Sequence, residues 1–432
     1  MRRREWANWA GNQRARPASV ARPTTETELV ELVRRARSTG RRVKAVGAGH
    51  SFTGVALTDG VLVDLRDYDR LLAFDPVTGR ATVQAGIRLA DLSRRLAERG
   101  AALENLGDIA YQSIAGATAT ATHGTGRRFG NLATGIVGMR LITGDGDVVE
   151  CSADEEPELL SVARVGVGAL GLVSELTVQC VPAFNLHAVE EPAPVDEVLG
   201  DWEGLLDDHD HFEFFWVPNT RWALTKRNRR TDEPARPRGR WERWRNGVLY
   251  DNVAFGAANR IARHRPAAVP RLGRALPSAG RVEYVEPGHR VFASPRLVRF
   301  LEMEYAIPLA AVPEALPRVR ELVRDLALPL LFPVEVRAVA ADDIALSPAF
   351  GRETGYLAVH VYRGTPHQAY FRGVEAIMDD YEGRPHWGKL HFQDAATLSA
   401  RYPEWSAFQA ARDRLDPHRT FANAELDRVL GP

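Results

Sequence analysis

Residues Val43–Phe52 read Val-Lys-Ala-Val-Gly-Ala-Gly-His-Ser-Phe, a short apolar run that leads into a glycine loop ending on a histidine. The apolar run predicts a buried strand. Because glycine has no Cβ, backbone N–H groups at Gly47 and Gly49 can approach a pyrophosphate closely. The stretch therefore predicts a strand followed by a phosphate-binding loop.

The type of dinucleotide is not decided by this loop alone. A nicotinamide-type fingerprint adds a third glycine and an amphipathic helix that opens at once. Here Ser51-Phe52-Thr53-Gly54 leads instead into a turn at residues 57–60. Asp64 lies at the spacing of a ribose-binding acid, so the nicotinamide alternative stays open at this point. His50, taken alone, is either a hydrogen-bonding loop residue or a catalytic or covalently linked group.

A second stretch, residues 112–126, reads Gln-Ser-Ile-Ala-Gly-Ala-Thr-Ala-Thr-Ala-Thr-His-Gly-Thr-Gly. It holds too few large apolar groups to pack as an ordinary core element. Its backbone N–H groups and hydroxyls can line a diphosphate and the polar edge of a flat ring. We interpret it as a ligand cradle.

Together the two stretches resemble the PCMH-type FAD domain of the vanillyl-alcohol-oxidase-like flavoproteins, in particular the sugar-1,4-lactone and alditol oxidases. In many of that family the histidine at the position of His50 is joined to the C8 methyl of the flavin. The resemblance implies FAD as the cofactor, held covalently through His50. It also implies cofactor contacts from Val46, Gly47, Ala48, Gly49, Ser51, Asp108, Ser113, Gly116, Ala117, Thr118, Ala119, His123, Gly124 and Leu172.

Composition limits the class of protein and its partners. A chain of 432 residues exceeds one compact core, so two domains are expected. The formal charge of zero argues against nucleic acid or an anionic membrane as the main partner, and no run of about eighteen apolar residues occurs. Two cysteines indicate a reducing compartment. We expect a cytoplasmic, monomeric protein that acts on a small molecule, and no metal ligands are assigned.

The order of apolar patterns predicts an α+β fold with two domains. We expect a FAD-binding domain at residues 1–182, a cap domain for the substrate at 183–394, and a segment at 395–432 that returns to the FAD domain. Two strand–helix–strand units, at 301–336 and 356–390, predict a mixed sheet in the cap. Residues 395–415 are predicted to form one helix.

The cap contains a candidate catalytic pair. Pro333-Val334-Glu335-Val336-Arg337 puts a carboxylate and a guanidinium two residues apart on a strand, and hence on one face. A solvated surface pair is the alternative, although the apolar approach at 330–332 argues against full solvation. Of 56 basic residues only Lys44, Lys226 and Lys389 are lysines. A lysine retained in such a chain suits a compact charge in a tight pocket, which singles out Lys389.

Glu335 with Arg337, the strand of His360, and His386-Trp387-Gly388-Lys389 match the alditol and lactone oxidase pattern in chain order. The resemblance implies that Glu335, Arg337, His360 and Lys389 are the catalytic residues and, with Asp108, bind the substrate. It also implies hydride transfer from a sugar-1,4-lactone to flavin N5. Glu335 and His360 are both candidate bases, and sequence does not choose between them.

Two positions concern the substrate and the acceptor. Asp108 stands where alditol oxidases tend to have serine, which disfavours an acyclic alditol. Gly107 would leave room beside the flavin for dioxygen, which favours an oxidase that releases hydrogen peroxide. An alditol oxidase, a dehydrogenase with another acceptor, and a non-catalytic sugar- or flavin-binding protein remain as alternatives.

Overall fold

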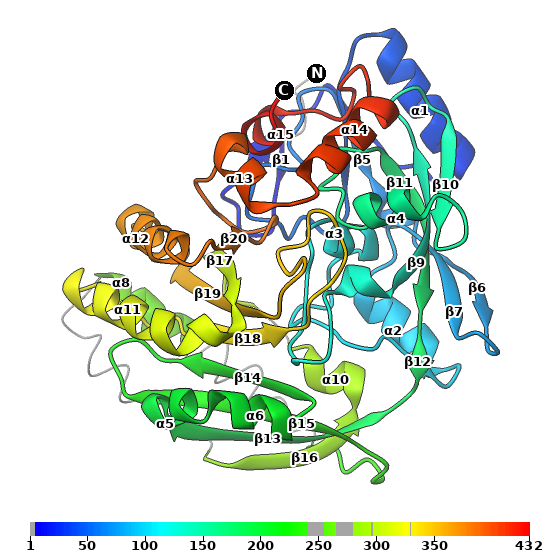
Figure 1. Cartoon of the computed structure of the whole chain (residues 1–432). Helices are drawn as coiled ribbons and strands as arrows, with labels where there is room; N and C mark the ends of the chain where they lie inside the picture. Colours follow the sequence, from blue (N-terminus) through cyan, green and yellow to red (C-terminus); the bar gives the residue numbers. More distant parts are fainter. Residues whose placement is uncertain (1–4, 240–254, 265–279, 295–296, 329) are drawn as a thin grey trace.

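The computed structural model describes residues 5–239, 255–264, 280–294, 297–328 and 330–432 (Figure 1). Its N-terminal part holds a two-stranded ribbon and a parallel sheet in the order β3–β5–β4. These strands are β1 (Trp6–Ala7), β2 (Arg14–Ala15), β3 (Ser19–Ala21), β4 (Val43–Val46) and β5 (Val61–Asp64). Helix α1, Glu26–Ser38, connects β3 to β4 and begins at a capping box formed by Thr25 and Glu28. The strand predicted before the glycine loop is confirmed as β4.

A five-stranded antiparallel sheet follows, in the order β10–β9–β11–β7–β6. Its strands are β6 (Leu71–Asp75), β7 (Arg80–Gln84), β9 (Ile136–Ile142), β10 (Val148–Ser152) and β11 (Leu172–Gln179). The same part of the chain contains η1 (Leu65–Asp67), α2 (Leu89–Ala97), β8 (Ala101–Ala102), α3 (Ile114–Ala119), η2 (Leu132–Gly135), α4 (Pro157–Ala163) and β12 (Val181–Pro182). Side chains from both sheets share one hydrophobic core.

The later part of the chain forms an eight-stranded sheet, which we call the cap sheet, in the order β16–β13–β15–β14–β18–β19–β17–β20. Its strands are β13 (Asn185–Pro194), β14 (His211–Trp216), β15 (Trp222–Thr231), β16 (Val282–Pro287), β17 (Phe300–Pro308), β18 (Val334–Val339), β19 (Thr354–Tyr362) and β20 (Arg384–Pro385). The helices of this part are α5 (Val195–Gly200), α6 (Trp202–Asp208), α8 (Phe255–His264), α10 (Gly288–Phe292), η5 (Leu309–Ala311), α11 (Val312–Asp325) and α12 (Gln368–Asp379).

The α+β class is confirmed, but the prediction of a mixed cap sheet is wrong. All seven strand pairs in the cap sheet are antiparallel. The two strand–helix–strand units exist, as β17–α11–β18 and β19–α12–β20. In each unit the two strands run in the same direction but are not neighbours, because a third strand lies between them. The order of elements along the chain correctly predicted a helix that connects two strands. It did not predict that a third strand lies between those two in the sheet.

The cap sheet has two different faces because its strands alternate with a period of two. On β17, Leu301, Met303 and Tyr305 belong to the core beneath α5, α6, α11 and α12, and corresponding residues of β14, β18 and β19 join them. The intervening residues, including Glu302 and Glu304, point to the opposite face. These acids are only 4% exposed, so that face is charged and also buried.

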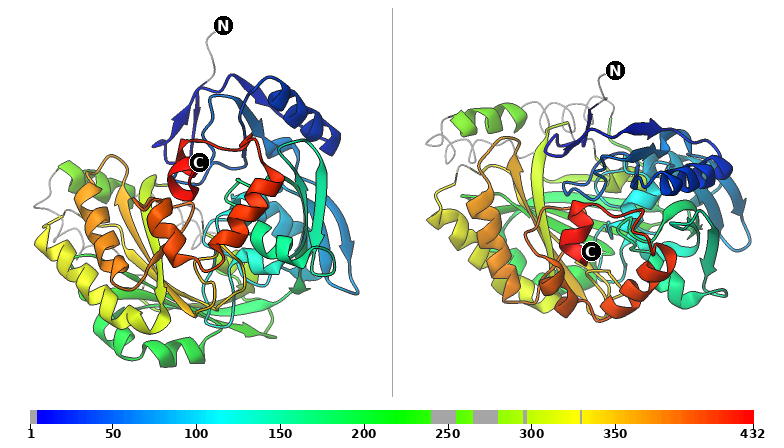
Figure 2. Two further views of the ribbon diagram at one scale, coloured as in Figure 1. Left: turned by 45° about the horizontal axis from the view of Figure 1, so that its top comes forward. Right: turned by 90° about the horizontal axis from the view of Figure 1, so that it is seen from above.

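The C-terminal segment lies over the junction between the N-terminal part and the cap sheet, as the red helices show in Figures 1 and 2. The single helix predicted for residues 395–415 is wrong, because α13 (Ala395–Arg401) and α14 (Trp405–Leu415) are separate. Pro403 lies between them, and proline cannot continue the hydrogen-bonded ladder. Helix α15 (Ala424–Leu430) begins at Asn423, whose side chain donates to the carbonyls of Gly54 and Leu57.

The predicted limits at residues 182 and 394 stay predictions. One large core is made mostly by residues before 182, joined by later residues such as Trp387 and Phe408, and Phe52 contributes to the core of the cap. Cys151 and Cys180 are buried free thiols. Among the described residues, no helix combines the length and the apolar character needed to cross a bilayer.

Leu357 on β19 tests the assignment of the apolar face. Its side chain is fully buried, so Leu357→Ala should lower the free energy of unfolding by about 2–5 kcal/mol. Leu72, which is 44% exposed, provides a matched control, and Leu72→Ala should change that free energy by no more than about 0.5 kcal/mol. Urea unfolding followed by circular dichroism measures both. Equal losses in the two variants would contradict the assignment.

Candidate active site

The two glycine-rich stretches meet. A Cβ added to Gly47 would lie 1.9 Å from Ser113 Oγ, so the loop after β4 touches the residue that precedes α3. Gly49 has φ of +69°, a conformation that side chains disfavour. The two glycine-rich stretches therefore pack against each other at Gly47 and Ser113, and their role in binding a cofactor stays a prediction.

Several residues of the predicted cradle turn their side chains inward. The Thr118 hydroxyl donates to the carbonyl of Ile114, and Ala117 is fully buried in the core. Leu172 opens β11 and packs in the same core. The side chains of Thr118, Ala117 and Leu172 are therefore committed to packing, and contact with a ligand would have to come from backbone atoms.

His50 lies in a closed environment at the end of the loop. Its ring stacks on that of Trp9, with centroids 5.4 Å apart and an interplanar angle of 17°. Burial lowers the pKa of His50 to about 4, so the ring is neutral at neutral pH. Its Nδ1 is buried and has no hydrogen-bond partner among the described residues. A neutral ring with one free nitrogen suits a bond or a contact to a ligand.

Residues 6–13, the N-terminal segment, hold the glycine loop in place through hydrogen bonds. The sequence analysis did not predict this contact. Trp9 N–H donates to the Gly49 carbonyl at 2.8 Å, and the Asn8 amide donates to the Ser51 carbonyl at 2.9 Å. The side chains of Asn12 and Gln13 both donate to the Phe52 carbonyl. The available signal was the combination of aromatic and amide residues at 6–13, which is unusual for an exposed terminus.

On the cap sheet, Glu335 and Arg337 lie on the buried charged face and form an ion pair. Arg337 also donates to Glu213 at 2.7 Å and lies 3.3 Å from Asp108. Lys226 pairs with Glu213 at 3.1 Å. The predicted pair is confirmed as neighbours, and the surface alternative is excluded because each residue is 7% exposed.

Burial raises the pKa of Glu335 to about 7; the charge of Arg337 opposes this, whereas Asp108 and Glu213 reinforce it. Burial acts to raise the pKa of Glu213, but the charges of Arg337 and Lys226 outweigh burial and hold that pKa below its usual range. Glu335 Oε1 is buried and is the oxygen that contacts Arg337 in the ion pair. This carboxyl is therefore titratable near neutral pH.

Glu302 connects the other two predicted catalytic residues. It lies opposite His360 in the β17–β19 register, pairs with Lys389, and has Oε1 3.4 Å from His360 Nε2. Burial would lower the pKa of Lys389 and that of His360, but the charge of Glu302 outweighs burial and raises both. Lys389 is therefore an ammonium at neutral pH, and the Glu302 charge favours the protonated form of His360.

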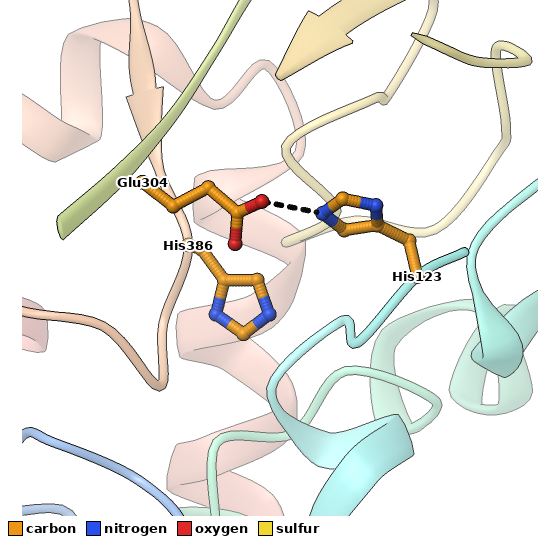
Figure 3. A group of neighbouring side chains, drawn as sticks. All are labelled: His123, Glu304 and His386. Carbon is orange, nitrogen blue, oxygen red and sulfur yellow. Dashed lines mark ion pairs between the residues drawn. The ribbon is translucent and has the colours of Figure 1, made fainter. Parts of the chain in front are cut away.

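Glu304, His123 and His386 form an adjoining buried group, whose potential ligand atoms lie within 4.8 Å of one another (Figure 3). His123 Nε2 lies 3.2 Å from Glu304, and its Nδ1 lies 2.8 Å from the Gly124 carbonyl. His386 Nδ1 accepts the N–H of Gly388. A histidine that binds a metal does so through an unprotonated ring nitrogen. In His386 that nitrogen is Nδ1, which already accepts the hydrogen bond from Gly388. We interpret this group as a hydrogen-bonded ion pair.

The His386–Lys389 stretch joins the cap to the glycine loop. Phe52 N–H donates to the Gly388 carbonyl at 2.7 Å, and the Thr53 hydroxyl donates to the Trp387 carbonyl at 3.1 Å. Lys389 Nζ lies 5.3 Å from the centre of the Phe52 ring. The cofactor residues and the catalytic residues predicted from sequence therefore border one region.

The sequence analysis assigned no role to five charged or titratable side chains of this region. They are Lys226, Glu213, Glu302, Glu304 and His386. The strict alternation at 301–307 placed both acids on one face, but sequence did not show that this face is buried. Gly107 also needs a new explanation. A Cβ there would lie 2.9 Å from the His123 carbonyl, so packing alone accounts for the glycine.

Comparison with known proteins agrees with this geometry. The profile named D-arabinono-1,4-lactone oxidase matches residues 176–429, and the profile named FAD binding domain matches residues 17–152. The chain belongs to the D-arabinono-1,4-lactone oxidase family. It is an FAD-dependent oxidoreductase, and the resemblance inferred from sequence is confirmed. The nicotinamide alternative for the glycine loop is therefore dropped.

The chain is 47% identical over 428 residues to an L-gulono-1,4-lactone dehydrogenase of Mycobacterium tuberculosis, with 99% of each chain covered. It is 34% identical to an L-gulonolactone oxidase of Scyliorhinus torazame and 33% identical to an alditol oxidase of a Streptomyces species, and each alignment covers at least 98% of both chains. Its fold matches that of a cholesterol oxidase from B. sterolicum, with a TM-score of 0.83, 18% identity, and coverage of 99% and 96%.

The residues present fit FAD. The Gly47 loop lies against Ser113 at the start of α3, where backbone N–H groups of both stretches could contact one diphosphate, and the unpartnered nitrogen of His50 is available to a flavin ring. The charged face of the cap sheet borders the same region. This fit is independent of the profile matches.

Gly47→Ala, alone and combined with Ser113→Gly, distinguishes the packing role of Gly47 from a role in ligand binding. The new Cβ would overlap only the Ser113 side chain, so Gly47→Ala should lower both stability and FAD content. Adding Ser113→Gly removes that overlap and should restore the melting temperature. FAD content, measured by absorbance per protein, should stay low in the double variant if the cradle holds the diphosphate. Full recovery of FAD would contradict this role.

Proposed function

We propose that the protein oxidises a hydroxyl-bearing carbon of a sugar-1,4-lactone of the L-gulono-1,4-lactone kind. The supporting observation is a buried charged face that holds Glu335, with a pKa near neutrality, between fixed cations. Bound FAD would supply the hydride acceptor, N5 of its isoalloxazine ring. The side chains then have to remove the hydroxyl proton and stabilise negative charge.

Glu335 is the proton acceptor in this proposal. A general base works best when its pKa lies near the operating pH, and burial brings Glu335 to about 7. His360 is the weaker candidate, because the charge of Glu302 raises its pKa against the effect of burial and so favours the protonated ring. The role that remains for His360 is to place positive charge on this face, because its two ring nitrogens already face the Pro333 carbonyl and Glu302.

The cations and Asp108 orient the substrate. Arg337 holds the Glu335 carboxylate through their ion pair and is itself held by Glu213. Lys389 places an ammonium on the same face, where it would stabilise charge on the substrate oxygen or on the pyrimidine edge of the flavin. Asp108, near Arg337 and Lys226, would accept hydrogen bonds from substrate hydroxyls.

An alditol oxidase is the second candidate for the substrate, since a relative of that name is 33% identical over nearly the whole chain. Asp108 speaks against it, because an acid changes the hydrogen bonding of a polyol there. A protein that only binds sugar or flavin would not need a carboxyl of raised pKa beside two cations, so this alternative is the weakest.

Two electron acceptors remain candidates. Dioxygen was favoured from sequence because Gly107 is small, but packing against the His123 carbonyl accounts for that residue. The name of the relative that is 47% identical favours a dehydrogenase. Reduced protein should therefore be mixed separately with air-saturated buffer and with a dye, and the faster flavin reoxidation identifies the acceptor class. Hydrogen peroxide should appear only if air-saturated buffer reoxidises the flavin.

Anaerobic flavin reduction tests the function itself. Purified holoprotein is mixed with a panel of aldono-1,4-lactones and of alditols, and the visible absorbance of oxidised flavin is followed. A lactone should bleach the flavin at lower concentration than any alditol. Bleaching by alditols alone would support the second candidate, and a persistent oxidised spectrum with every compound would contradict catalysis.

His50 should carry the flavin covalently, since its neutral ring and unpartnered Nδ1 suit attachment to the C8 methyl. Acid-precipitated wild-type protein should stay yellow, and His50→Ala should lose its flavin to the supernatant. His418→Ala provides a control, because the side chain of His418 is 56% exposed and remote from the loop. A colourless pellet from wild-type holoprotein would contradict the linkage.

The rate of flavin reduction should depend on the ionisation of Glu335. Because burial raises its pKa to about 7, the carboxylate that accepts the proton forms only as pH rises through that value. The rate should therefore increase with pH, with an apparent pKa near 7. Glu335→Gln should remove this rise and slow reduction by about 10²- to 10⁴-fold.

Glu375→Gln is the matched control for that pH profile, because Glu375 is a buried carboxyl on α12, on the apolar side of the sheet. It should keep both the rate and the rise. Stopped-flow reduction across the pH range measures all three proteins. A rise that persists in Glu335→Gln would transfer the base role to another residue.

A further inference from the structure

Glu302 is a buried carboxylate for which neither the family resemblance nor the proposed chemistry provides a role. It is the third residue of β17 and is 4% exposed. Its two oxygens contact two different partners: Oε1 faces His360 Nε2 at 3.4 Å, and Oε2 pairs with Lys389. One side chain therefore links the two cations that border the site.

The hydrogen bonds of His360 define its charge state from geometry. Its Nδ1 lies 2.9 Å from the carbonyl of Pro333, and a carbonyl can only accept. Its Nε2 faces the Glu302 carboxylate, which also accepts. Both ring nitrogens therefore need protons, and the ring is an imidazolium. Without the Glu302 charge, burial would favour the neutral ring.

Lys389 depends on the same carboxylate. Its side chain is 19% exposed and forms its ion pair with Glu302, so this contact fixes where the ammonium lies. Glu304 adds negative potential nearby but is paired with His123. Loss of Glu302 would leave Lys389 and His360 without their shared counter-ion.

We propose that Glu302 is a positioning residue that fixes the Lys389 ammonium and keeps His360 protonated. Glu335 is then the one proton acceptor among these groups on the charged face. The inference rests on the proposed function for Lys389, His360 and Glu335, but the bridge itself is independent of substrate. Glu302 contacts neither substrate nor reacting atoms in this account and acts through its two partners.

The kinetic test compares Glu302→Gln, Lys389→Met and the double variant with wild-type holoprotein. Loss of the outer partner of a functional group commonly costs roughly 10- to 100-fold, and we expect Glu302→Gln to slow flavin reduction by that much. In the Lys389→Met background the same change should cost less than about 3-fold, because coupled residues are not additive. Equal costs in both backgrounds would overturn the proposal.

Two readouts do not depend on turnover. Nitrogen NMR with labelled histidine should show the His360 ring as imidazolium at neutral pH in wild type and as neutral imidazole in Glu302→Gln. The signal is assigned by its loss in His360→Gln. The falls in melting temperature for Glu302→Gln and Lys389→Met should sum to more than the fall in the double variant. An unchanged imidazolium signal, or additive falls in melting temperature, would overturn the bridge.

Glu286→Gln is the matched control, since Glu286 is a buried acid beside Arg238 on β16, at the far edge of the same sheet. It should leave the reduction rate and the His360 signal unchanged. If Glu302→Gln does not fold, Glu302→Asp replaces it. The shorter side chain keeps the charge but cannot reach both partners, so it should also slow reduction, and a wild-type rate would overturn the proposal.

Failure of the proposed function would look different. In that case no lactone or alditol would reduce the wild-type flavin, while the NMR signals and melting temperatures would still decide whether Glu302 bridges Lys389 and His360.

Discussion

The structure depends on the need to pair charges that are buried on one face of the cap sheet. Moving a carboxylate or an ammonium out of water costs several kcal/mol, and only close partners in good geometry offset that cost. The period of two along each strand collects Glu302, Glu304, Glu335 and Arg337 on this face, while the alternate residues fill the core beneath the helices. Antiparallel register then places opposite charges side by side: Glu213 opposite both Lys226 and Arg337, and Glu302 opposite His360.

This pairing also separates the pKa values of similar groups. Glu302 has two cationic neighbours, and although burial acts to raise its pKa, their charges hold it at about 2. Glu335 has two neighbouring acids, Asp108 and Glu213, which oppose the charges of Arg337 and His360, and burial raises its pKa to about 7. Two carboxyls on adjoining parts of one sheet therefore suit different roles, one as a fixed counter-ion and one as a proton acceptor. Hydrogen bonds from Phe52 and Thr53, at the end of the glycine loop, to the His386–Lys389 stretch bring this face to the place predicted for the flavin.

Local patterns allowed much of this arrangement to be predicted. The strand before the glycine loop and the shared face of Glu335 and Arg337 follow from residue spacing alone. The argument from rare lysines singled out Lys389, and Lys44 and Lys226 prove to be mostly buried as well: Lys44 donates to the carbonyls of Gly168 and Phe421. What sequence did not provide was long-range adjacency. Glu302 and Lys389 are far apart in the chain, and the strand inserted into each strand–helix–strand unit turned an expected mixed sheet into an antiparallel one. The break at Pro403, in contrast, was visible in the sequence and was overlooked.

The most direct test of the account is a crystal structure of the holoprotein with its flavin reduced and an aldono-1,4-lactone bound. The account predicts that the lactone lies between the flavin and the charged face of the cap sheet. One ring hydroxyl should be within hydrogen-bond distance of the Glu335 carboxylate, with the Lys389 ammonium near the same oxygen. A lactone bound on another wall of the site, or one whose hydroxyls do not reach Glu335, would contradict the claim that this face carries the chemistry.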